Sequence, residues 1–159
     1  PLRMFIDMNL TLKIPPPLLL LICAGAMYLL APLGPRFQPQ EGLFWLLLGL
    51  GFSLDCAASL LFLCARTSAD PVQIDKASRL VTAGIYRLSR NPMYLGLGLL
   101  LLGWAARLAS PLALLPVAYF FFHLNRWQIP AEEALLRAKF PTDYGRYCAT
   151  TGRWLWFWR

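Results

Sequence analysis

The sequence predicts an all-α integral membrane protein with four transmembrane helices, in which a C-terminal helix and a loop cap the cytoplasmic end of the bundle. Three observations support this fold class. Hydrophobic residues make up 58% of the 159 residues and the mean hydropathy is +0.51, which is too apolar for a soluble domain of this size. Four apolar runs come close to the roughly 20 residues that a helix needs to cross a bilayer. Basic residues are concentrated on alternate connections between these runs.

The first two predicted spans are Ile14–Pro35 and Leu43–Ala65. The first opens with Pro15-Pro16-Pro17, which suits a helix start because proline lacks the N–H that the first turn leaves unbonded. That run is long and has no small-residue cleavage site, so we expect no cleavable signal peptide. The second run contains one charged residue, Asp55, which is costly in a bilayer. Asp55 is therefore expected to face the bundle interior or be protonated, and a structural hydrogen bond is its favoured role.

The next two predicted spans are Pro92–Leu108 and Leu112–Ile129. Their connection, Arg107–Pro111, is so short that the two spans must form an antiparallel helical hairpin. The earlier connection, Leu33–Gly42, is rich in proline and glycine and predicts a tight turn. Small residues in the second and third spans permit close helix approach: Gly49, Gly51, Ala57, Ala58, Gly96, Gly98 and Gly103.

Two segments are predicted to cap the bundle. The loop Arg66–Asn91 is long and mixed in charge, and loops of that length usually carry function or disorder. After the fourth span, Pro130 followed by AEEALLRAKF predicts a new helix with proline at its start and acids in its first turn. The aromatic cluster Trp154–Trp158 is expected to anchor the tail at the lipid head groups. We therefore treat 1–159 as a single domain, with spans at about 14–35, 43–65, 92–108 and 112–129 and a cytoplasmic cap made of 66–91 and 130–159.

The distribution of basic residues predicts the orientation. Of the 15 Lys and Arg residues, 13 lie on the side of both termini and the cap, and only Arg36 and Arg107 lie on the other side. By the positive-inside rule, the side with 13 cations is cytoplasmic. The net charge of +7 is thus attributed to orientation and to contact with anionic lipids, and no nucleic-acid partner is expected. The four cysteines lack metal-ligand spacing, so no metal site is predicted.

One segment concentrates polar residues at the mouth of an apolar run. In Thr82–Gly96, TAGIYRLSRNPMYLG, Pro92 ends a loop and begins a helix. The first N–H groups of that helix lack partners and can hold an anionic group of a ligand. Arg90 adds a permanent charge, and Tyr86 and Tyr94 offer aromatic faces. The segment therefore predicts a small-ligand site at a membrane surface.

The order LVTAGIYRLSRNPMYLG, helical hairpin and EEALLRAKFPTDYGRY resembles the isoprenylcysteine carboxyl methyltransferase family, in particular its short bacterial members, over about Lys13–Trp154. That family's signature is R-H-P-x-Y, a hairpin and then E-E. The resemblance implies a membrane methyltransferase of the bacterial inner membrane that binds S-adenosylmethionine in a pocket capped by the cytoplasmic segments. It implies a cofactor site made of Gln73, Ser78, Leu80, Val81, Tyr86, Asn91, Pro92, Met93, Tyr94 and Glu132.

The chain departs from the family pattern at three positions. Asn91 stands where histidine is usual, and Pro141 where glycine is common. Gln128 occupies the position of the family arginine that faces the substrate. Arg126 is close enough to take over that role, so we assign catalytic roles to Arg126 and Arg90.

The residue types suit the chemistry of S-adenosylmethionine, which carries a sulfonium, an ammonium and a carboxylate. Glu132 can pair with the ammonium, and Arg90 or helix-start N–H groups can hold the carboxylate. The faces of Tyr86 and Tyr94 can stabilise the sulfonium. No metal is needed for an in-line methyl transfer. The neighbouring glutamate, Glu133, is four residues before an arginine and is expected to form a surface ion pair with it.

Four functions are compatible with the sequence. The leading one is methylation of a lipophilic acceptor, an isoprenylcysteine-type carboxylate, because the guanidinium of Arg126 grips a carboxylate and repels an ammonium. The alternative is an amine head group, as in phospholipid methylation, for which His123 is a candidate base, although an interfacial structural histidine is favoured. A sterol-type reductase would need cations for the 2′-phosphate of NADPH, for which Lys76 and Arg79 are the candidates in the loop. A non-enzymatic membrane scaffold is the last alternative.

Overall fold

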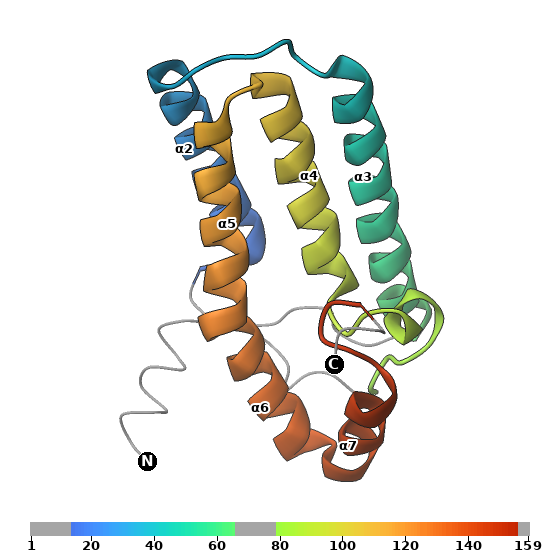
Figure 1. Ribbon diagram of the computed structural model, residues 1–159. Helices are drawn as coiled ribbons and strands as arrows, with labels where there is room; N and C mark the ends of the chain where they lie inside the picture. Colours follow the sequence, from blue (N-terminus) through green and yellow to red (C-terminus); the bar gives the residue numbers. More distant parts are fainter. Residues whose placement is uncertain (1–13, 66–78, 156–159) are drawn as a thin grey trace.

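The computed structural model describes residues 14–65 and 79–155 (Figure 1). Within these ranges all regular secondary structure is helical. Four helices stand side by side, and two further helices lie at one end of the bundle. The four are α2 (Pro16–Leu30), α3 (Glu41–Cys64), α4 (Pro92–Leu108) and α5 (Leu114–His123), and the two are α6 (Ile129–Lys139) and α7 (Pro141–Thr150). Short helical turns are η1 (Ala31–Leu33), η3 (Gly84–Arg87), η4 (Pro111–Ala113) and the π-helical η5 (Leu124–Gln128).

Proline occupies the first turn of α2, α4, α6 and α7, where its missing N–H breaks no intrahelical bond. The expected helix start at Pro92 is confirmed, and Asn91 before it has φ −130° and ψ 53°, outside the helical region. The expected helix with Pro130 and an acid in its first turn is confirmed as α6, but this helix is not separate from α5. The chain runs from α5 into α6 without a break, and the π-helical turn η5 lies just before Pro130, so this turn accommodates the proline within one continuous helix.

Helices α3 and α4 approach each other at glycines, as the sequence predicts. A Cβ added at Gly51 would lie 2.8 Å from the carbonyl oxygen of Gly96, and one added at Gly103 would lie 3.2 Å from the carbonyl oxygen of Phe44. Side chains at these positions would force the helices apart. On the other side of α4, α2 and α5 complete the bundle through buried residues that include Met27, Leu101 and Phe120.

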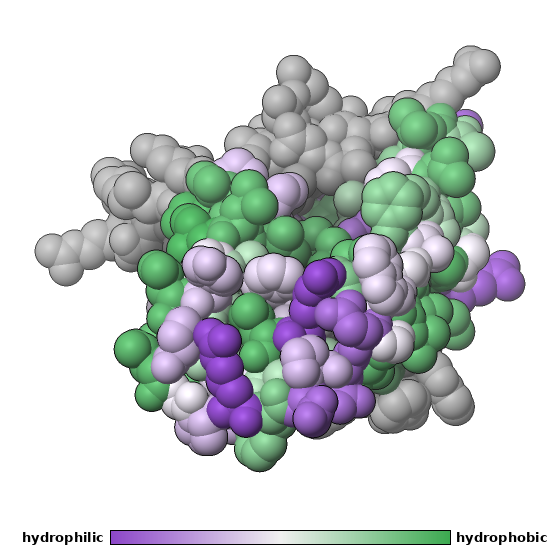
Figure 2. Space-filling view, turned by 90° about the horizontal axis from the view of Figure 1, so that it is seen from above, coloured by the Kyte–Doolittle hydropathy of each residue, from purple (hydrophilic) through white to green (hydrophobic). Residues whose placement is uncertain are grey.

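The outer surface of the bundle is apolar. Leu29, Phe52 and Leu63 are each more than 60% exposed, which suits contact with lipid rather than water. Figure 2 shows one end of the molecule, where hydrophilic side chains form a patch bordered by hydrophobic ones. Two helices are long and apolar enough to cross a membrane, Pro16–Leu33 and Glu41–Cys64, and Pro92–Leu108 is apolar but shorter. These two helices are candidate membrane spans, and the presence of four membrane spans remains a prediction.

Candidate functional site

A cavity of about 390 Å³ lies where α3, the segment before α4, the start of α4 and the cap helices α6 and α7 meet. Eight of the ten residues predicted to contact the cofactor line it, namely Leu80, Val81, Tyr86, Asn91, Pro92, Met93, Tyr94 and Glu132. The other two, Gln73 and Ser78, lie outside the described residues. The cavity volume is within the range of sites for small ligands.

Glu132 is held in the cavity by two hydrogen bonds. The hydroxyl of Tyr94 donates to its Oε1 atom at 2.5 Å, and the side-chain amide of Gln128, one turn earlier, donates to the same oxygen at 2.6 Å. Burial raises the pKa of the Glu132 carboxyl to about 7, against the lowering effect of these two donors. Gln128, which departs from the family pattern, is thus a buried residue that orients Glu132. Gln128 lies four residues before Glu132, a spacing that places two residues on one face of a helix, and this was the signal in the sequence for a contact that was not predicted.

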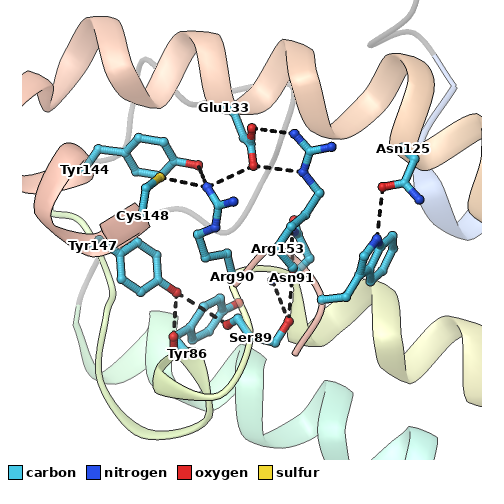
Figure 3. Close-up of polar contacts among 11 residues, drawn as sticks. Tyr86, Ser89, Arg90, Asn91, Asn125, Glu133, Tyr144, Tyr147, Cys148 and Arg153 are labelled. Atoms are coloured by element: carbon cyan, nitrogen blue, oxygen red, sulfur yellow. Dashed lines mark hydrogen bonds and ion pairs between the residues drawn. The ribbon is translucent and has the colours of Figure 1, made fainter. Parts of the chain in front are cut away.

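Glu133 is also buried, with 7% of its surface exposed (Figure 3). Its Oε1 lies 3.0 Å from Nη1 of Arg90, and its Oε2 lies 2.8 Å from Nη2 of Arg153. The expected surface ion pair between Glu133 and Arg137 is therefore wrong. The helix turns both glutamates inward, and Glu133 meets arginines that are distant in the sequence.

Arg90 lines the cavity but its charge is already paired. Besides Glu133, its Nη1 atom donates to the Sγ of Cys148 at 2.7 Å and to the Tyr144 hydroxyl at 3.4 Å. Only 13% of the side chain is exposed. The arrangement suits a residue that holds α6 and α7 against the start of α4. The predicted catalytic role of Arg90 stays a prediction.

The C-terminal segment is tied to the turn before α4. The side-chain amide of Asn91 donates to the carbonyl oxygen of Arg153 at 2.9 Å, and the Ser89 hydroxyl donates to the same oxygen at 3.3 Å. The backbone N–H of Arg90 donates to the carbonyl oxygen of Gly152 at 3.1 Å. Asn91 therefore lines the cavity while its side chain holds the tail in place. These long-range contacts carry no local signal in the sequence.

Tyr86 presents a buried ring to the cavity. It is 6% exposed, and its ring packs edge-on against Phe62 at a centroid distance of 5.4 Å. The hydroxyl of Tyr147 donates to its carbonyl oxygen at 2.6 Å. Burial, and then the negative charges of Asp55 and Glu132, raise the pKa of the Tyr86 hydroxyl, so it stays protonated. The ring is a rigid, uncharged aromatic surface beside two carboxylates.

Asp55, for which the sequence favoured a structural role, lines the same cavity from α3. Its carboxylate lies directly against the backbone of Gly96 in α4. The Oδ1 atom is buried and has no hydrogen-bond partner within 14–65 and 79–155. The expected structural hydrogen bond is thus not found at this atom.

Two other candidate residues lie away from the cavity. Arg126 is exposed and is not among the described residues that line it. His123 also does not line it. The His123 ring contacts the rings of Tyr119 and Trp127 at tilted angles, and neither of its nitrogens has a hydrogen-bond partner in the described part of the chain. The structure brings neither residue to the site that contains Glu132.

The chain is similar to a methyltransferase family and to proteins named as probable methyltransferases. The family described as phospholipid methyltransferase matches residues 42–143. A protein of Haemophilus influenzae named only as uncharacterized is 44% identical over 63 residues, which are 40% of this chain and 100% of that protein. Two rice proteins, from Oryza sativa subsp. indica and subsp. japonica, are named as probable protein-S-isoprenylcysteine O-methyltransferases and are each 30% identical over 76 residues. That match covers 48% of this chain and 40% of each rice protein. No solved structure matches the chain.

Proposed function

The chain belongs to the phospholipid methyltransferase family, and from this premise we propose that it transfers the methyl group of S-adenosylmethionine to a lipid-borne acceptor. The family match and the rice relatives confirm the resemblance to the isoprenylcysteine carboxyl methyltransferase family. With its two long apolar helices, the chain is a membrane methyltransferase. The observation that carries the proposal is the cavity in which Tyr86, Tyr94 and Glu132 converge.

The residues of the cavity fit the charges of S-adenosylmethionine. Both donors to Glu132 bond its Oε1, and within the described ranges no donor reaches Oε2, which leaves that oxygen for the ammonium of the donor molecule. The rings of Tyr86 and Tyr94 suit the sulfonium. The first N–H groups of α4 suit the carboxylate, because the charge of Arg90 is already paired with Glu133. The bound donor supplies an electrophilic methyl group, and the protein aligns the acceptor and excludes water.

The charge of the cavity favours an amine acceptor over a carboxylate. Arg126, which was expected to bind a carboxylate acceptor, is exposed and away from the cavity. The cavity is lined by three carboxylates and two arginines, namely Asp55, Glu132, Glu133, Arg79 and Arg90. Glu133 and Arg90 pair with each other, and the excess of carboxylates would repel another one. An isoprenylcysteine-type carboxylate is retained as the second candidate, because the two rice relatives are named for that substrate.

We expect S-adenosylmethionine or its demethylated product to bind the detergent-purified protein, and NADPH not to bind. The reason is that Glu132 and the two tyrosines suit a sulfonium and an ammonium. Isothermal titration calorimetry with each of the three compounds tests the proposal. Tight binding of NADPH without binding of either sulfur compound would reject it.

We also propose four spans with both termini in the cytoplasm, on the basis of the 13 basic residues on one side. A cysteine introduced at Gln38, an exposed residue in the turn between α2 and α3, should react with an impermeant maleimide only from outside the cell. Gly34 is less suitable, because a Cβ there would lie 2.8 Å from Leu112. The matched control is Thr142→Cys, an exposed position in the cap, which should react only after the membrane is opened. The reverse labelling pattern would show that the termini lie outside the cell and would reject the proposed orientation.

Anionic lipids are the second proposed partner. A wide groove of about 840 Å³ on the cap is lined by Arg87, Arg146 and Thr150, all exposed, with Asp143 as a described acidic residue beside them. Exposed arginines near a membrane surface attract anionic head groups. The groove shares Leu80 with the cavity, so the lipid surface would lie next to the site.

A further inference from the structure

Asp55 is placed deeper in the bundle than the residues that hold Glu132. It lies nine residues before the end of α3 at Cys64, or about 14 Å along the helix axis. It contacts α4 at Gly96, beyond Tyr94 when α4 is followed from its start at Pro92. Among the described residues that line the cavity, Asp55 thus lies at the end nearest the bilayer interior, whereas Glu132 lies at the end nearest the cap.

One oxygen of the Asp55 carboxylate, Oδ1, is buried without a partner in the described part of the chain. A carboxylate buried without a partner is costly, and such groups in membrane helices usually serve a ligand or a proton transfer. Space for it is provided by Gly96, where any side chain would overlap the carboxylate. The fold therefore accommodates Asp55 at the cavity without using it to join helices.

A cationic acceptor would meet this carboxylate. Two arginines, Arg79 and Arg90, also line the cavity, but Oδ1 of Asp55 bonds neither of them, and the charge of Arg90 is paired with Glu133. An alkyl amine is protonated at neutral pH and has no free electron pair until it loses a proton. His123, the other candidate base, does not line the cavity. Asp55 is therefore placed to pair with the ammonium and to remove its proton.

We propose that Asp55 is a catalytic residue that binds the ammonium of the acceptor and takes its proton before methyl transfer. This inference rests on the proposed function. The N–H bond of the ammonium breaks, and the proton goes to the carboxylate of Asp55. The free electron pair of nitrogen then forms a bond to the methyl carbon, while the methyl–sulfur bond breaks and its electron pair stays on sulfur. The methylated nitrogen carries the positive charge, and the proton on Asp55 leaves to solvent.

The test compares Asp55→Asn with the wild-type protein, reconstituted in vesicles that contain phosphatidylethanolamine. Transfer of labelled methyl groups should fall at least about 100-fold, the usual contribution of a general base. The dissociation constant for S-adenosylmethionine, measured by calorimetry, should change by less than about threefold, because its ammonium pairs with Glu132. The matched control is Ser53→Ala on the same helix, whose hydroxyl is exposed and bonds only the carbonyl oxygen of Gly49 at 2.7 Å among the described residues. Its activity should equal that of the wild type.

A second acceptor, which needs no proton removed before methyl transfer, distinguishes the role of Asp55 as a base from its other possible roles. An alkylaniline is uncharged at neutral pH, so its methylation should be much less sensitive to Asp55→Asn. Equal losses with both acceptors would overturn the role as base. Three other outcomes would overturn the inference without rejecting methyl transfer. The methylation rate of Asp55→Asn could equal that of the wild type, or it could fall only as much as the affinity for S-adenosylmethionine falls. The wild-type protein could also methylate N-acetyl-S-farnesylcysteine but no amine. Absence of cofactor binding in the wild type would instead reject the proposed function itself.

Discussion

Replacing Glu133 with Gln is expected to lower the free energy of unfolding by about 3–5 kcal/mol, the usual cost of removing one partner from a buried ion pair. Glu133 lies between Arg90 at 3.0 Å and Arg153 at 2.8 Å, and it is 7% exposed. Its amide would leave Arg90, whose side chain is 13% exposed, without a compensating charge. Because this pair joins the start of α4 to α6, the cap should loosen first. Chemical denaturation in detergent measures the effect.

The chain offers a matched control for this prediction. Glu41 and Arg107 form an ion pair at 3.5 Å at the other end of the bundle, and their side chains are 54% and 43% exposed. Glu41→Gln should cost less than about 1 kcal/mol, as exposed pairs do. If Glu133→Gln costs no more than Glu41→Gln, the buried pair does not hold the cap.

Replacing Glu132 with Gln is expected to weaken S-adenosylmethionine binding by about 1.5–3 kcal/mol, the range for a hydrogen bond to a charged group. This corresponds to a loss of roughly 10- to 150-fold in affinity. The amide keeps the shape of the side chain and can still accept the hydrogen bonds of Tyr94 and Gln128 at its oxygen. Only the negative charge that meets the ligand ammonium is lost. Calorimetry on the purified variant gives the value.

The pH dependence of binding provides an independent check on Glu132. Burial raises its carboxyl pKa to about 7, so wild-type affinity should fall as the pH is lowered through 7, while Glu132→Gln should show no such fall. In the ligand-free protein the pKa of the Glu132 carboxyl lies above its ordinary value of 4.5, so the ionised carboxyl destabilises the fold. That cost is fully present above pH 7 and disappears below about pH 4.5. Glu132→Gln should therefore stabilise the ligand-free protein at pH 8, opposite in sign to Glu133→Gln. If Glu132→Gln and Glu133→Gln are both well folded and lose equal affinity for S-adenosylmethionine, the assignment of Glu132 to the ligand ammonium is wrong.

Local properties of the sequence determined much of the fold. Runs of apolar residues marked α2, α3 and α4, because a helix in lipid must present apolar side chains over its whole length. Proline marked the start of α4, and glycine marked where α3 and α4 approach. The convergence of the segment around Tyr86 and Tyr94 with Glu132 came from the resemblance and not from spacing. Helix α7 was missed, although Pro141 and Asp143 occupy its first turn and are the usual signals of a helix start.

The tertiary structure alone decided which way α6 faces and what its side chains meet. The π-helical turn η5 inserts a residue before α6, which turns the following side chains by about 100° relative to an unbroken helix. A rule of four-residue spacing assigned Glu133 to a surface partner, whereas the folded chain supplies Arg90 and Arg153 from far along the sequence. Asp55 likewise became part of the site only when α4 packed against α3. Spacing identifies neighbours within one helix, but the partners of a buried charge depend on how separate helices are rotated and packed.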